Sequence, residues 1–147
     1  MEGYYGFVDS VYDALILFEA FCAKKIPRVT RRLTREERDR IRSGSVFLWD
    51  EDEASILRWT DGRRWSSSRP CGNFIVYDEL DAFGSNYPIL RGGLIKRALS
   101  INTADGRRMH LVSYYTASDV ESGRLTVPRT DPNLANIRIR EQIYPEL

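Results

Sequence analysis

The feature that most constrains the fold is a pair of apolar runs near residue 100, separated by a tight turn. "LIKRALSI" (residues 94–101) and "RRMHLVSYY" (residues 107–115) flank the turn "NTADG". Two such runs around a short glycine-containing turn predict a β-hairpin, because glycine relieves the backbone where the chain must reverse. The chain must therefore build a sheet that contains this hairpin.

Further strands are expected upstream of the hairpin. "SVFLW" (residues 45–49) and "SILRWT" (residues 55–60) have strand-like composition, and the acidic stretch at residues 50–54 is expected to join them as a turn. "NFIVYDEL" (residues 73–80) is a third apolar run whose type the pattern leaves ambiguous. Residues 81–93 contain three glycines and a proline, which are typical of a linker.

Helices are expected around the sheet. Residues 10–22 show an amphipathic pattern that begins with a capping box from Ser10 to Asp13 and cannot pass Pro27. The expected core stripe is Val11, Leu15, Phe18 and Cys22. Thr34 and Glu37 form a second capping box, on a short peripheral helix that ends before Gly44. A helical turn is expected at residues 119–123, and another begins at Asp131-Pro132. The fold class is therefore α+β.

Length and composition narrow the class of protein. A chain of 147 residues suits one domain, or two small lobes that share one core. No apolar run approaches the ~20 residues of a membrane span, and no signal peptide precedes the first expected helix. The two cysteines, Cys22 and Cys71, give neither a disulfide framework nor a zinc signature, which favours a reducing compartment.

The charge is unevenly distributed although the formal net charge is only +1. Residues 24–42 contain nine Lys or Arg against three acidic residues, and residues 58–69 contain four arginines against Asp61 alone. Such a basic face indicates a polyanionic partner such as nucleic acid. A solvated helix face with internal ion pairs is the alternative for residues 24–42, and a protein-interaction module that meets an acidic partner is the alternative function.

The segment "RWTDGRRWSSSR" (residues 58–69) combines a turn, aromatic residues and guanidinium groups. Asp61-Gly62 predicts a tight turn, with Trp59 and Trp65 as apolar anchors for its two legs. A hairpin tip of this kind would project arginine, whose side chain suits the narrow minor groove of A·T-rich DNA. The alternative is that both tryptophans belong to the core and that the arginines pair with Asp61 and the acids at 50–53.

Catalytic chemistry has little support in the sequence. His110 is the only histidine and lies in a strand pattern, which is more typical of a core or edge residue than of a base. No nucleophile pattern and no phosphate-binding P-loop is present. Asp50–Glu53 could hold magnesium for a nuclease, but four consecutive acids in a turn point in different directions. The sequence therefore predicts a protein that is not an enzyme and that holds no metal or cofactor.

The chain closely resembles the WOPR domain, which defines a fungal family of DNA-binding regulators of morphology and development. The resemblance rests on "RSGSVF.W", "RWTDGR.WS.SR" and "HLVSYY", which occur together and in this order. It covers nearly the whole chain, treated as one domain over residues 1–147. A first block spans residues 3–80, a linker residues 81–92, a second block residues 93–135 and a C-terminal segment residues 136–147.

The resemblance implies that the two blocks interleave their strands into one shared mixed or antiparallel sheet, flanked by helices. It also implies a nuclear transcription regulator whose sheet enters the major groove of double-stranded DNA while an arginine reads an A·T-rich minor groove. Partnership with other transcription regulators would involve regions outside this chain. The matching arginine here is Arg63. The other residues expected at the DNA are Thr60, Asp61, Gly62, Trp59, Trp65, Arg64, Ser66, Ser68, Arg69, Arg58, Arg31, Arg32 and Lys96.

The chain departs from the family pattern in three places. Its linker is short, "SSSR" stands where "SPSR" is expected, and a second arginine follows Arg63. That second arginine leaves open whether Arg63 or Arg64 enters the groove. The sequence "RRLT" also suggests regulation at Thr34, because two preceding arginines suit basophilic kinases. Phosphate there would bring about −1.5 to −2 charge close to DNA. Helix capping alone is the alternative role of Thr34.

Overall fold

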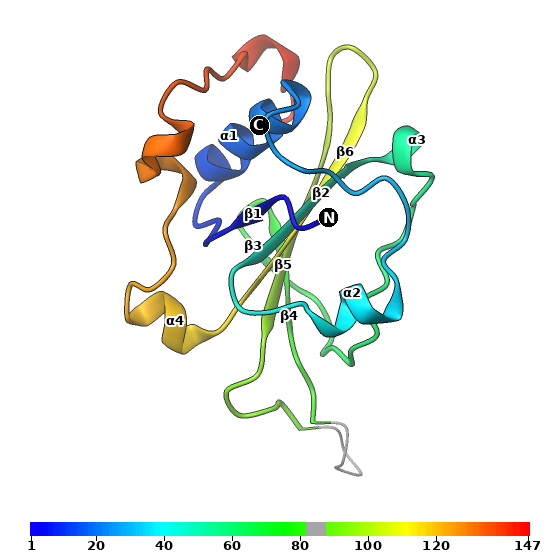
Figure 1. The fold of residues 1–147 in the computed structure, drawn as a ribbon, viewed down its shortest axis with the longest axis vertical. Coiled ribbons are helices and arrows are strands. Elements are labelled where there is room, and N and C mark those ends of the chain that lie inside the picture. Colours follow the sequence, from blue (N-terminus) through cyan, green and yellow to red (C-terminus); the bar gives the residue numbers. More distant parts are fainter. Residues whose placement is uncertain (82–87) are drawn as a thin grey trace.

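The computed structural model describes residues 1–81 and 88–147, and its centre is a six-stranded antiparallel sheet (Figure 1). The strands are β1 Tyr4–Tyr5, β2 Ser45–Asp50, β3 Arg69–Cys71, β4 Phe74–Asp78, β5 Ile95–Asn102 and β6 Arg108–Tyr115. The helices are α1 Val11–Cys22, α2 Arg35–Asp39, α3 Glu51–Ala54 and α4 Ala117–Glu121, with 3-10 turns η1 Pro128–Thr130, η2 Pro132–Leu134 and η3 Glu141–Ile143. The α+β fold class is confirmed.

The strand order β1-β2-β6-β5-β4-β3 confirms that the two halves of the chain share one sheet. The hairpin of β5 and β6 lies between β2 and β4, so the later strands are inserted among the earlier ones. Of the two pairings that flank this hairpin, that of β2 with β6 joins strands that are distant in sequence, whereas β4 and β5 are consecutive strands. Neither half could complete the sheet without the other, because β2 and β4 would each lose a neighbouring strand.

Different elements pack against the two faces of the sheet. One face packs against α1 and the C-terminal segment, in a core that includes Leu48, Leu111 and Tyr144. The other face packs against the segments around α2 and the loop after α3, in a core that includes Trp49 and Tyr114. Figure 1 shows α1 and α2 on opposite sides of the sheet. The basic segments therefore lie over the second face.

Helix α1 is more buried than its sequence pattern predicts. The capping box between Ser10 and Asp13 is present. However, Val11, Leu15 and Cys22 are only partly buried, and Ala14, Ile16, Leu17 and Phe21 are buried together with Phe18. The single-stripe prediction was wrong because the C-terminal segment covers a further side of the helix. Arg140 of this segment pairs with the buried carboxylate of Glu19, and Arg129 of η1 pairs with that of Asp13.

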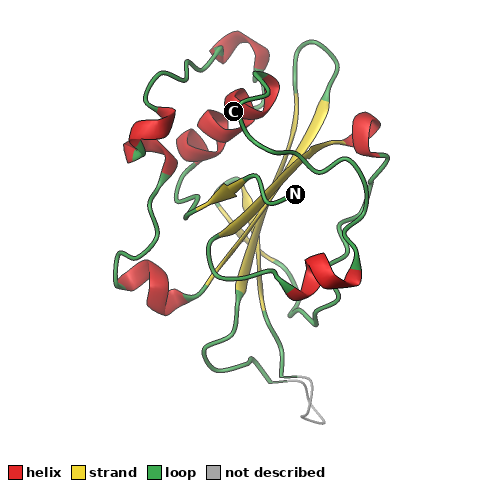
Figure 2. Ribbon diagram, viewed as in Figure 1, coloured by secondary structure: helices red, strands yellow, loops and turns green. Residues whose placement is uncertain are grey.

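The expected strand at residues 55–60 does not form. Ser55 adopts a left-handed conformation with φ 56°, and the chain then crosses the face of the sheet as a loop. Figure 2 shows that this segment continues without helix or strand from α3 to β3. The physical reason is that both edges of β2 are already occupied, one by β1 and the Val29 amide and the other by β6. The expected acidic turn between the two strands is instead the helix α3.

The short helices follow their local signals. Thr34 caps α2 in a capping box with Glu37, and α2 has no buried residue, as expected for a peripheral helix. The helical turn expected at 119–123 is α4, and Asp131 caps η2. The ambiguous run at residues 73–80 contains β4. In the described part of the chain, no helix has both the length and the apolar character needed to span a membrane.

The proposed linker lies partly outside the described residues, which exclude 82–87. Its described ends are held together, since Leu80 forms an isolated bridge with Ile89 and the Leu90 amide donates to the Glu79 carbonyl at 2.8 Å. The two described ends of the connection from β4 to β5 therefore lie side by side.

Candidate nucleic-acid interface

The loop of residues 58–65 is organised around the buried carboxylate of Asp61. One carboxylate oxygen accepts from the Trp65 indole at 3.0 Å and from the Arg63 amide at 3.2 Å. The other accepts from the Tyr114 hydroxyl at 2.6 Å and the Lys96 ammonium at 3.1 Å. Gly62 follows with φ +76°, the left-handed conformation that the Asp-Gly turn requires. Asp61 thus fastens the loop to β5 and β6.

The pKa values of Asp61, Lys96 and Tyr114 in this network all depart from their ordinary values. Burial by itself would raise the pKa of the Asp61 carboxyl, but Lys96 and the Trp65 and Tyr114 hydrogen bonds lower it below its ordinary value. Burial lowers the pKa of Lys96 despite the opposing effect of Asp61. Burial and the nearby Asp61 raise the pKa of Tyr114. The network therefore holds one buried ion pair, surrounded by neutral donors.

Both tryptophans fix the loop to the sheet face. The Trp59 indole donates to the Tyr114 hydroxyl at 2.7 Å, and its ring stacks on Trp49 with centroids 4.8 Å apart. The Trp65 ring lies beneath the Lys96 ammonium, 4.4 Å from its centroid. Aromatic contacts of this kind restrain a loop whose β pairing is limited to the isolated bridge between Trp65 and Glu79.

Arg63 is held inside the structure rather than projected from it. One terminal nitrogen lies 3.2 Å from the Glu79 carboxylate, and the other donates to the Ile41 carbonyl at 3.1 Å. Its side chain is 26% exposed. The expectation of a hairpin tip that projects this arginine was therefore wrong for the free protein. The cause is Glu79, which follows β4 and lies beside the loop.

Other arginines of the segment are more exposed. Arg58 and Arg64 are both exposed side chains of this loop. Arg32 reaches across from the preceding basic segment and donates to the Arg58 carbonyl and the Thr60 hydroxyl, each at 3.3 Å. Arg31 pairs with Glu37 at 2.7 Å and is 56% exposed. These contacts bring two basic segments, 31–32 and 58–64, to one surface.

The remaining expected site residues take different positions. Ser66 is part-buried and accepts from the Asp78 amide at 2.9 Å, whereas Ser68 is exposed. Arg69 begins β3 and pairs with Asp78. Lys96 is only 12% exposed, so its ammonium does not face solvent as the expected groove contact requires. Its position in β5 is as expected, but the buried Asp61 directs the ammonium inward.

Thr34 is exposed at the start of α2. Its hydroxyl accepts from the Glu37 amide at 3.2 Å, and the Glu37 carboxylate accepts from the Thr34 amide at 2.8 Å. Hydrogen bonds from Arg31 and from the Thr34 backbone lower the pKa of Glu37 to about 2. The threonine hydroxyl therefore has a capping role while remaining accessible.

The acidic side chains at residues 50–53 contact different partners and do not converge on one site. Asp50 caps α3 and pairs with Arg107 at 2.9 Å. Glu51 lies 2.7 Å from His110, whose other ring nitrogen lies 2.6 Å from the Ser100 hydroxyl. Glu53 pairs with Arg28. Within residues 1–81 and 88–147, no group of three or more histidine, cysteine or acidic side chains is arranged to hold a metal ion.

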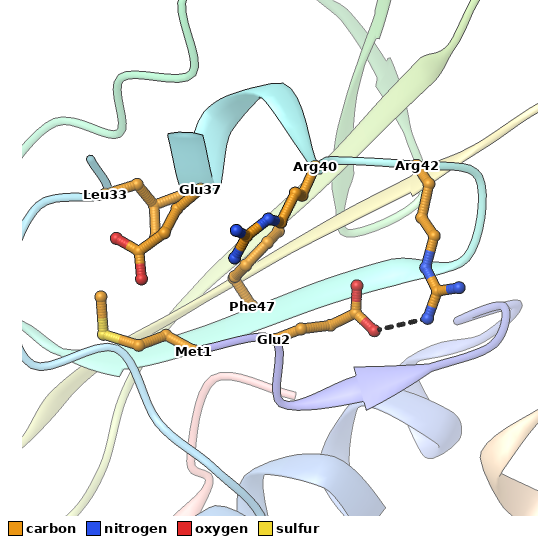
Figure 3. Close-up of a pocket in the computed structure, with 7 residues that line it drawn as sticks. All are labelled: Met1, Glu2, Leu33, Glu37, Arg40, Arg42 and Phe47. Atoms are coloured by element: carbon orange, nitrogen blue, oxygen red, sulfur yellow. Dashed lines mark hydrogen bonds and ion pairs between the residues drawn. The ribbon is translucent and has the colours of Figure 1, made fainter. Parts of the chain in front are cut away.

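Two hollows flank helix α2. One, shown in Figure 3, has an apolar floor that includes Leu33 and Phe47 and a rim that includes Glu37 of α2 and Arg40, which directly follows α2. Its Glu2 pairs with Arg42, as the dashed line marks. The other hollow lies between α2 and the loop. It is lined by Arg35, Arg38, Asp39, Asp61, Gly62 and Arg63.

Sequence reasoning missed the contacts that decide how the loop is held. Glu79, Ile41 and Tyr114 each lie far along the chain from the loop residues that they bind. Their local sequence contexts carry no signal for these contacts, because they arise from the order of the strands. A carboxylate next to a predicted turn indicates capping or solvation, and the burial of Asp61 became visible only in the folded chain.

The comparisons with known proteins agree with this fold. The model of the Gti1/Pac2 family matches residues 3–88, which is more than half of the chain. The chain belongs to this family, whose domain is the WOPR domain. It is 34% identical to the cAMP-independent regulatory protein pac2 of Schizosaccharomyces pombe, over 99% of this chain and 83% of pac2. That alignment extends over 197 residues, so pac2 has insertions relative to this chain.

Other relatives share the family. The chain is 30% identical to the global transcription regulator sge1 of Gibberella moniliformis, over 95% of this chain and 61% of that protein. The chain thus spans less than two thirds of the sge1 protein. Among solved structures, it resembles the WOPR domain of Wor1 from Candida albicans in complex with a 13-bp double-stranded DNA. The TM-score is 0.82 at 34% identity, with 95% of this chain and 91% of that chain covered.

Proposed function

We propose that this chain is a sequence-specific, double-stranded DNA-binding domain of a transcription regulator that acts in the nucleus without catalysis or a cofactor. The observation that carries the proposal is the surface where segments 31–32 and 58–64 meet, because it gathers arginines on a loop fixed by buried hydrogen bonds. Phosphate contacts from such a surface supply affinity, and a positioned side chain supplies sequence preference. Its relative pac2 is named as a regulatory protein and its relative sge1 as a global transcription regulator, and the similar Wor1 domain is described with DNA.

The finer proposal is that an arginine of this loop enters the minor groove of an A·T-rich site while the sheet contacts the neighbouring major groove. A narrow minor groove has enhanced negative potential, which favours an inserted guanidinium. Arg64 is exposed, whereas Arg63 is only 26% exposed and would have to leave both Glu79 and the Ile41 carbonyl to enter the groove. The geometry therefore favours Arg64 for insertion and gives Arg63 the role of holding the loop.

Other residues have supporting roles in this proposal. Lys96 and Asp61 position the loop from below, with Trp59, Trp65 and Gly62 as its framework. The exposed side chains contact phosphates or flanking bases: Arg31, Arg32, Arg58, Thr60, Ser68 and Arg69. Ser66 acts indirectly, because its hydroxyl holds β4.

The test is a selection of binding sites from random duplexes, followed by affinity measurements with Arg63→Ala and Arg64→Ala. One mismatched base pair costs about 1–3 kcal/mol, so loss of a groove-inserted arginine should weaken the best site at least as much. Arg64→Ala should do so at unchanged thermal stability, while Arg63→Ala should lower thermal stability as well. Arg124→Ala is the control, since Arg124 is 74% exposed and pairs only loosely with Asp119.

The outcomes separate the alternatives. If both loop variants bind the selected site within a factor of two of the parent, the minor-groove proposal is wrong. If no duplex is enriched and an acidic protein binds instead, the protein-interaction alternative replaces the DNA-binding proposal. Cleavage of duplex DNA that requires magnesium would revive the nuclease alternative.

A further inference from the structure

The hollow between α2 and the loop has the composition of an anion site. It has a volume of about 430 Å³ and is lined by the six residues Arg35, Arg38, Asp39, Asp61, Gly62 and Arg63. Three of these are arginines, and they come from two separate segments of the chain. Because the loop tip itself forms one wall, whatever occupies the hollow lies directly beside the proposed DNA-reading residues. We call this hollow the α2 cleft.

Two guanidinium groups of the α2 cleft contain unused donors. The Nε atoms of Arg38 and Arg63 are buried and, among the described residues, have no hydrogen-bond partner. A buried donor without a partner costs free energy, and a shift of the arginine side chain toward an anionic acceptor would recover it. The Arg38 guanidinium also covers Gly62, since a Cβ placed there would lie 3.5 Å from the Arg38 Nη1 atom. The absence of a side chain at Gly62 thus keeps the wall of the cleft open.

The charges of the α2 cleft are not balanced internally. Asp61 is already paired with Lys96, and Arg63 with Glu79. In the described part of the chain, the other three charged lining residues form no ion pair with one another or with any other residue: Arg35, Arg38 and Asp39. Two arginines against one aspartate leave a surplus positive charge. In the hollow of Figure 3, by contrast, Glu2 and Glu37 already have arginine partners.

We infer that the α2 cleft binds one backbone phosphate of DNA, clamped by Arg35 and Arg38 beside the loop tip. This rests on the proposed function and extends it, because it assigns a phosphate to a particular pair of side chains. A guanidinium group presents several donors in a planar fork that matches phosphate oxygens. The clamp fixes the position of the loop on the duplex and carries no base preference of its own. Asp39 opposes the phosphate and limits the strength of the clamp.

The principal test compares Arg38→Gln with Arg124→Gln, which removes an equal charge far from α2. Duplex affinity is measured over a range of salt concentrations, for the selected site and for a scrambled duplex. Each lost phosphate contact lowers the salt slope by about 0.9. Arg38→Gln should lower the slope by that amount and weaken both duplexes by the same factor, about tenfold. Arg124→Gln should leave slope and affinity unchanged. Equal slopes for the two variants would overturn the proposal.

A second measurement locates the phosphate without relying on one variant. Methylphosphonate is placed at each backbone position of the selected duplex in turn, which removes one phosphate charge at a time. One position should weaken binding by the parent protein about tenfold and leave binding by Arg38→Gln unchanged. If the parent and Arg38→Gln lose the same affinity at every position, the clamp does not exist. Asp39→Asn should raise affinity for all duplexes, and unchanged or weaker binding would count against the charge argument.

A third measurement keeps the inference testable if Arg38→Gln does not fold. Inorganic phosphate is titrated into the parent protein while the NMR signals of the arginine Nε–Hε groups are followed. The Arg38 signal should shift and saturate with phosphate, and should remain unmoved by chloride at equal ionic strength. Absence of a phosphate-specific shift would overturn the inference. If the parent protein bound all duplexes equally while this shift persisted, the proposed sequence-specific function would be wrong. Phosphate binding in the α2 cleft would still be supported.

Discussion

Replacement of Asp61 by asparagine should destabilise the protein more than any exposed substitution near the loop. Asp61 is 6% exposed, and its two oxygens receive four donors, including the ammonium of Lys96. Asparagine has the same shape, but it removes the negative charge and places an amide NH₂ where only acceptors fit. Lys96 would then be a buried cation without its carboxylate.

The magnitude follows from the burial of this pair. Removal of one partner from a buried ion pair costs about 3–5 kcal/mol. The lower end applies here, since Lys96 is 12% exposed and retains its contact with the Trp65 ring. We therefore expect Asp61→Asn to lower the free energy of unfolding by about 3 kcal/mol. For a chain of this length that corresponds to a fall in Tm of roughly 6–12 °C.

The assay is urea unfolding followed by tryptophan fluorescence, because Trp59 and Trp65 both contact this network. Asp39→Asn is the matched control, since it makes the same chemical change at an exposed residue and should cost less than about 0.5 kcal/mol. Asp61→Asn combined with Lys96→Met should recover about 1–2 kcal/mol, because the unpaired cation is then gone. A loss below about 1 kcal/mol for Asp61→Asn, at unchanged m-value, would refute the reasoning.

The Asp61 carboxylate also makes the stability of the protein depend on pH. The folded pKa of Asp61 lies below its ordinary value of 3.8. Its stabilisation is therefore present above about pH 3.8 and is lost as the pH falls through the folded pKa. Stability curves of the parent protein and Asp61→Asn should converge as the pH is lowered below 3.8. Parallel curves over that range would show that the ion pair contributes nothing.

The remaining predictions concern α2 and the sheet edge. Thr34→Glu should weaken binding to duplex DNA without unfolding the protein, as measured by affinity and circular dichroism, and unchanged affinity would count against regulation at Thr34. Glu37→Gln should remove a small acid-dependent loss of stability between about pH 4.5 and 2, and this loss is small because the Arg31 pair is largely exposed. Gly44→Ala should cost about 1–3 kcal/mol in thermal unfolding, since φ is +104° and the new Cβ would lie 2.4 Å from the Tyr5 ring. Gly106→Ala, with φ +87° and open space around it, should cost only about 1 kcal/mol.

Local sequence patterns determined much of the secondary structure. The hairpin of β5 and β6, strand β2 and the capping boxes at Ser10 and Thr34 all follow from signals within a few residues. Such signals are reliable because the backbone hydrogen bonds and turn conformations that they describe are made between near neighbours. The interleaved sheet was expected from the family resemblance, not from local patterns, and the strand order β2-β6-β5-β4 confirms it.

Only the tertiary structure decided how the functional loop is held. The segment at 55–60 has strand-like composition but cannot pair with β2, because β1 and Val29 occupy one side of β2 and β6 occupies the other. Arg63 was expected to project, yet Glu79 and Ile41 hold it, and Lys96 turns inward to Asp61. These partners lie 16 to 35 residues apart in the chain. The sequence thus supplied the chemical groups of the surface, while the order of the strands determined which of them face solvent.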